Sequence, residues 1–76
     1  MLYFVWYDDS PKKPTGDKLQ EAIAAYVVRF NGPPNLVLAN TADQFELTDV
    51  TVRYERTVQP NTFWLGNDDH VELPIG

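Results

Sequence analysis

One amphipathic stretch, residues 19–30, constrains the fold of this chain more than any other feature. Apolar side chains recur in it at the spacing that lines one face of a helix. They are Leu19, Ala22, Ile23, Tyr26, Val27 and Phe30. No other segment keeps a helical period over that length, and the remainder has the pattern of short strands and turns. One helix therefore has to cover a small sheet.

Capping signals on both sides of this stretch predict where the helix begins and ends. Asp17 is the preferred N-cap, because Gln20 follows three residues later as in a capping box and an acid suits the helix dipole. Thr15 is the alternative N-cap. Asn31 and Gly32 supply a left-handed C-terminal cap, and the two prolines that follow prevent continuation. The helix is predicted over about residues 17–30.

The strands are predicted from runs of β-branched and aromatic residues. Residues 2–7 are apolar at every position, which indicates a central strand with both faces buried. Residues 36–39 form a second buried strand, which a helical crossover would place parallel to the first. Residues 50–58 alternate between apolar and polar, residues 62–65 are predicted to return as a hairpin, and residues 70–73 are a candidate edge strand.

These elements define an α+β fold in a single domain, residues 1–76. It is a two-layer β-α-β-β-β(-β) sandwich, with the helix at about residues 17–30 packed on one face of a mixed sheet of four or five strands. One helix covers one face only, so the other face should stay uncovered, and an uncovered apolar face predicts a docking partner. The predicted interface residues are Tyr3, Val5, Tyr7, Phe63 and Trp64.

Composition and charge exclude several classes of function. The net charge is −5, from eleven acids and six bases, which argues against direct binding of nucleic acid. An acidic inhibitor that imitates nucleic acid is an alternative. The chain has no cysteine, so neither a disulfide nor a thiolate metal site can form. It also has no run of about 18 apolar residues and no secretory leader, so we expect a cytoplasmic protein without membrane contact.

Acidic residues supply the strongest alternative function, a metal-dependent hydrolase or nuclease. Asp8 and Asp9 follow the first strand; Asp68, Asp69 and His70 follow the fourth. These groups would meet at one edge of the sheet if the two strands ran parallel. Carboxylates with an imidazole suit Mg²⁺, Mn²⁺ or Ca²⁺. Paired aspartates also end strands and cap turns, because their side chains bind nearby amides.

No other pattern in the chain indicates catalysis. Ser10 is the only serine and lies far in sequence from His70, and the four glycines are isolated rather than gathered in a phosphate-binding loop. The sequence therefore favours a small, acidic, non-catalytic protein-interaction module that requires no cofactor. Its partner is another protein or a second copy of itself, in which case it forms a homodimer.

Overall fold

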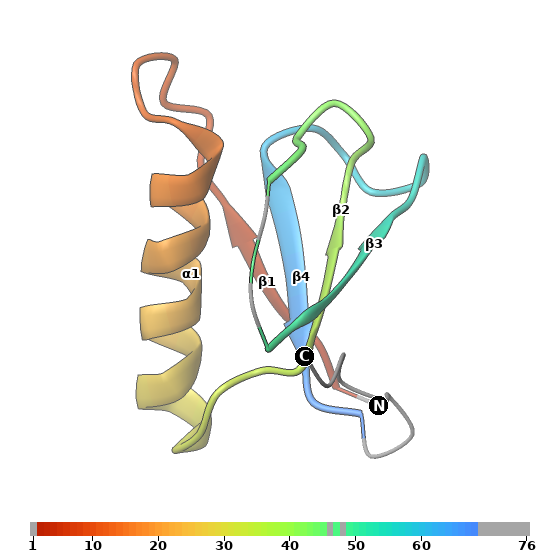
Figure 1. Ribbon diagram of the computed structural model, residues 1–76. Coiled ribbons are helices and arrows are strands. Elements are labelled where there is room, and N and C mark those ends of the chain that lie inside the picture. Colours follow the sequence, from red (N-terminus) through yellow and green to blue (C-terminus); the bar gives the residue numbers. More distant parts are fainter. Residues whose placement is uncertain (1, 46, 48, 69–76) are drawn as a thin grey trace.

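The computed structural model describes residues 2–45, 47 and 49–68, and within them it contains one helix packed against a four-stranded mixed sheet (Figure 1). This is the α+β fold that the sequence predicts. In chain order the elements are β1 (Phe4–Tyr7), α1 (Thr15–Phe30), β2 (Leu36–Ala39), β3 (Thr51–Tyr54) and β4 (Thr62–Gly66). The candidate fifth strand, residues 70–73, lies outside the described residues.

The order of the strands differs from the prediction in two respects. The sheet runs β1-β4-β2-β3, with β4 antiparallel to both of its neighbours and β2 parallel to β3. The first strand is therefore an edge strand and not a central one, and β3 and β4 do not form a hairpin. β1 has only β4 as a neighbouring strand. Its apolar side chains alternate between the core side of the sheet and the open side, which explains why every position of the run is apolar.

α1 begins slightly earlier than predicted and ends where predicted. Pro14 occupies the N-cap position in an extended conformation, and among the described residues no side-chain hydrogen bond caps the helix, so the predicted caps at Asp17 and Thr15 are wrong. Proline suits this place because its fixed φ leads the chain into the first turn. At the other end Asn31 adopts a φ of 61° and its N–H donates to the carbonyl of Val27, as the C-cap prediction requires.

The core lies between α1 and one face of the sheet. Leu19, Ala22 and Tyr26 of the helix pack with Phe63 and Leu65 of β4. The segment that links β2 to β3 also packs against this core, through its described residues Phe45, Leu47 and Val50. It contributes Phe45, whose ring meets that of Phe63 at a centroid distance of 6.1 Å. The helix covers this face together with the β2–β3 connection, and not alone.

Candidate docking surface

The uncovered face of the sheet carries a row of exposed apolar side chains. Val5 and Tyr7 of β1 are 50% and 61% exposed, and Trp64 of β4 is 37% exposed. The register places Val5 beside Trp64, and Trp64 beside Leu38 of β2. Among the described residues, the only helix lies on the opposite face. The row therefore reaches solvent from the β1 edge to the middle of the sheet, and we call it the docking face.

Trp64 occupies the centre of the docking face and is held in place by Tyr3. The two rings meet edge to face at a centroid distance of 5.6 Å. Tyr3 can reach this place because residue 66 is glycine: a Cβ there would lie 3.1 Å from the Tyr3 ring. The aromatic pair is thus supported by the backbone of β4, and Trp64 is presented in a defined orientation.

Two shallow hollows lie beside Trp64, so the docking face is not flat. One, of about 310 Å³, is lined by Leu38, Glu55, Thr57, Val58 and Trp64. The other, of about 270 Å³, is lined by Val5, Thr57, Gln59, Thr62 and Trp64. Residues of the connection between β3 and β4, residues 55–61, line one side of both hollows. The Val58 carbonyl fixes that connection by accepting a hydrogen bond from the Asn40 amide at 2.8 Å.

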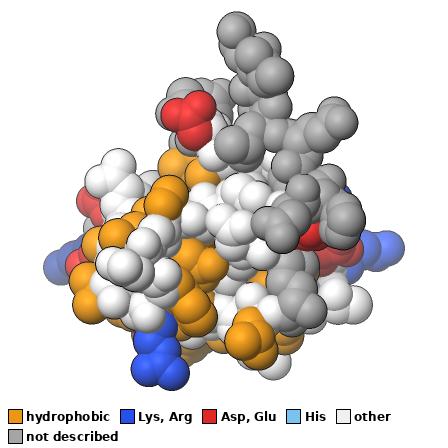
Figure 2. Space-filling model, turned by 90° about the horizontal axis from the view of Figure 1, so that it is seen from below, with side chains coloured by type: hydrophobic (Ala, Val, Ile, Leu, Met, Phe, Trp, Pro, Cys, Tyr) orange, Lys and Arg blue, Asp and Glu red, His pale blue; other side chains and the backbone are white. Residues whose placement is uncertain are grey.

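Hydrophobic side chains also reach the surface at the end of the sheet where β4 ends. Figure 2 views the molecule from this end and shows them between charged groups at the margins. The exposed apolar residues of the helix include Val27, Val28 and Phe30. Apolar surface is therefore present on the helix as well as on the docking face.

The structure places four of the five predicted interface residues on the docking face. Phe63 is the exception, because side chains alternate along β4 and its ring points into the core, where it is fully buried. Sequence reasoning missed Leu38 and the wall formed by residues 55–61. The uniformly apolar run of β2 hides which positions face outward. No local pattern shows that a connection will fold back against a particular face.

The predicted acidic residues that the structure describes do not converge. Because β1 and β4 run antiparallel, Asp8 and Asp9 lie at one end of the sheet and Asp68 at the other. The parallel arrangement from which the metal site was predicted is therefore wrong. Asp69 and His70 lie outside the described residues. In the part of the chain that the structure describes, no three Asp, Glu or His side chains are grouped so as to hold a metal ion.

The backbone of Asp68 holds the end of β4. Its N–H donates to the side-chain oxygen of Asn35 at 2.8 Å, and its carbonyl accepts from the Asn35 amide nitrogen at 2.7 Å. This reciprocal pair joins the end of β4 to the start of β2. The Asn35 side chain thus has the structural role that asparagine often takes beside a strand end.

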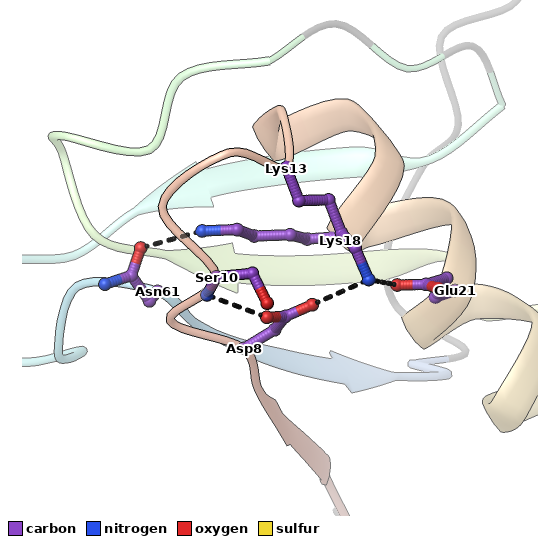
Figure 3. A network of polar contacts seen from close by, with 6 residues as sticks. All are labelled: Asp8, Ser10, Lys13, Lys18, Glu21 and Asn61. Carbon is purple, nitrogen blue, oxygen red and sulfur yellow. Dashed lines mark hydrogen bonds and ion pairs between the residues drawn. The ribbon is translucent and has the colours of Figure 1, made fainter.

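Asp8 joins the loop after β1 to α1 (Figure 3). One carboxylate oxygen accepts from the Ser10 N–H at 3.0 Å, and the other lies 3.3 Å from the Lys13 ammonium. Lys13 also donates to Glu21 of the helix at 2.6 Å. The hydrogen bonds from Ser10, with a further contribution from Lys13, lower the pKa of Asp8 to about 2. The carboxylate is thus held in its charged form.

Lys18 joins the first turn of α1 to the start of β4 and lies beside the same network (Figure 3). It is buried, and its ammonium donates to the side-chain oxygen of Asn61 at 3.1 Å. The Asn61 N–H donates in turn to the buried carboxylate of Asp43 at 2.7 Å. Asn61 has a φ of 64°, which asparagine tolerates better than most residues. These polar groups have hydrogen-bond partners within the fold.

The lowered pKa of Asp8 predicts an acid-sensitive fold. A carboxyl with a depressed folded-state pKa stabilises the protein above its unfolded pKa of about 4. That stability is lost as the pH falls from about 5 towards 2. We expect Asp8→Asn, which keeps an oxygen for Ser10, to have a shallower loss of unfolding free energy over this range. Urea unfolding at a series of pH values measures it, and equal slopes for the two proteins would refute the assignment.

Comparisons with known proteins assign no family to this chain. No model of a known protein family matches it, and searches of characterised proteins and of solved structures find no significant match. Within the described residues there is also no helix with the length and apolarity needed to cross a bilayer. The class that the fold defines is a small α+β domain with an open mixed sheet.

Proposed function

We propose that this protein is a non-catalytic interaction module that binds other protein surfaces through the docking face. The observation that carries the proposal is the exposed row of Val5, Tyr7 and Trp64 on the side of the sheet away from α1. Burial of such side chains contributes about 25 cal/mol for each Å² of apolar surface removed from water. The binding requires neither a metal ion nor a cofactor.

The chemistry of the face matches that of protein interfaces rather than that of a nucleic-acid site. Protein interfaces have aromatic anchors at the centre and polar groups at the rim. Here Trp64 lies between two hollows, with Glu55 and Gln59 at their margins. A nucleic-acid site would need a concentration of positive charge, and the chain has a net charge of −5. The partner surface should therefore present apolar or aromatic side chains that fill the hollows.

Selection from a random displayed-peptide library tests the proposal. We expect recovered peptides to be rich in aromatic and apolar residues, and to lose binding when Tyr7→Lys places a charge on the face. Val28→Lys is the matched control, because Val28 is an apolar residue 88% exposed on α1. Far-UV circular dichroism should show that both variants are folded. Peptides that bind the Tyr7→Lys protein as well as the unchanged one would place the binding surface elsewhere.

A further inference from the structure

The outer edge of β1 has backbone groups directed away from the sheet. The Asp8 N–H donates to the Asn61 carbonyl at 3.0 Å, which puts Asp8 and Asn61 at the position of a hydrogen-bonded pair in the antiparallel ladder, although the Asn61 N–H itself donates to Asp43. Such pairs alternate with pairs whose N–H and C=O groups point outward. Phe4 and Trp6 therefore bond towards β4. Val5 and Tyr7 direct their N–H and C=O groups outward, and no described residue pairs with this edge.

Although β1 is only four residues long, its edge lacks the other features that usually prevent strands from pairing between molecules. Natural edge strands are blunted by charged side chains, proline, bulges or great shortness. Residues 2–7 contain no charge and no proline, and β1 pairs with β4 without a bulge. Val5 and Tyr7 are also well exposed on the docking face beside the edge. The edge is therefore a template for an added strand.

We propose that β1 pairs antiparallel with β1 of a second copy of this chain, with Val5 opposite Val5 on the two-fold axis. Tyr3 of each copy then lies opposite Tyr7 of the other, and the outward backbone groups of all three positions find partners. Other registers also pair the odd-numbered residues, whose backbone groups point outward. In each of them, however, at least one of Tyr3, Val5 and Tyr7 lies opposite a residue outside the apolar run 2–7. The two copies supply identical, self-complementary edges, as a two-fold interface requires.

The distribution of charge is compatible with a second copy as the occupant and disfavours a shift of the register towards the acidic end. In the proposed register the uncharged run of one chain lies along that of the other, and Asp8 lies opposite Leu2. A shift by two residues towards the acidic end would instead place Asp9 opposite Tyr3 and Asp8 opposite Phe4. No pair of acids meets across the interface in the proposed register. Two chains that each have a net charge of −5 can thus associate without opposing like charges at the contact.

The helices leave room for this pairing. α1 packs most closely on β4, so the two helices of a dimer would be separated by about three strand spacings, or about 14 Å. Packed helices lie about 8–10 Å apart, so the helices do not collide. On this side of the core the ring of Phe4, from β1, contacts the ring of Phe30, at the end of α1, with a centroid distance of 6.1 Å. In the proposed dimer these two rings would add apolar surface to the contact between the copies, on the side of the sheet that α1 covers.

Antiparallel pairing places both docking faces on the same side of one continuous sheet. Two four-stranded sheets become a sheet of eight strands that presents Trp64 twice. This inference extends the proposed function, because it makes the dimer a doubled binding surface. The edge and the docking face share Val5 and Tyr7, but Trp64 of β4 belongs to the docking face alone, so its substitution tests the face without touching the edge.

Paired substitutions at Val5 test the register directly. Val5→Lys would place two ammonium groups opposite each other at the two-fold axis, and Val5→Glu two carboxylates. The position is 50% exposed, so both variants should fold. We expect light scattering across a concentration series to give twice the mass of one chain for the unchanged protein and the mass of one chain for each variant. An equimolar mixture of the two variants should recover the doubled mass.

Three outcomes would overturn the pairing: a monomeric unchanged protein, variants that remain dimeric, or a mixture that stays monomeric. Substitutions of Trp64 separate such a failure from a failure of the proposed function. If Trp64→Lys abolishes self-association and the Val5 variants do not, the copies dock face to face and the edge inference is wrong. Selected peptides that bind a monomeric protein through the docking face would leave the proposed function standing without the dimer.

Discussion

Phe63→Ala should lower the free energy of unfolding by about 3–5 kcal/mol, the range for truncation of a buried phenylalanine. Phe63 is fully buried under α1, and its ring packs against Phe45 of the β2–β3 connection. A domain of 76 residues has a total stability of about 4–11 kcal/mol. The substitution therefore removes a large part of the stability, and a substantial unfolded population is expected.

Trp64→Ala is the matched control for Phe63→Ala. Trp64 is the next residue of the same strand and a still larger aromatic, but its side chain lies on the docking face. Its loss should cost about 1 kcal/mol, near the centre of the distribution for point substitutions. Urea unfolding followed by circular dichroism measures both variants. If Trp64→Ala were the more destabilising, the two faces of the sheet would have been assigned the wrong way round.

Trp64→Lys should weaken binding of face-selected peptides by more than about 30-fold, which corresponds to the 2 kcal/mol that defines an interface hot spot. The charge would lie between the two hollows, where a docked side chain would otherwise exclude water. Titration of a labelled peptide against each protein measures the loss. Self-association through the β1 edge should persist in this variant, because Trp64 belongs to β4, an interior strand of the sheet.

Trp64→Tyr provides the conservative comparison, since it keeps an aromatic ring at the centre of the face. We expect it to retain most of the affinity, because tyrosine supplies much of the same apolar contact. Equal losses for the lysine and tyrosine variants would mean that the indole itself is recognised. Unchanged affinity in both would remove Trp64 from the binding surface and contradict the proposed function.

The features that depend on local periodicity could be predicted from the sequence. Side chains at helical spacing define the buried stripe of α1 wherever it packs, and Asn31 ends the helix through its own backbone conformation. Alternation along a strand likewise separates Phe4 and Trp6 from Val5 and Tyr7. The N-terminal cap was the local feature predicted wrongly, because Pro14 begins the helix without any side-chain cap.

Only the tertiary structure decided which strands are neighbours, and with them the candidate site. The insertion of β4 between β1 and β2 makes β1 an edge, separates Asp8 from Asp68 and directs Phe63 into the core. Pairing between strands depends on contacts between residues far apart in the chain, and an apolar run looks the same beside one neighbour or two. The sequence by itself therefore determined the elements and their apolar faces, whereas the packing of the whole chain decided which faces and edges remain open.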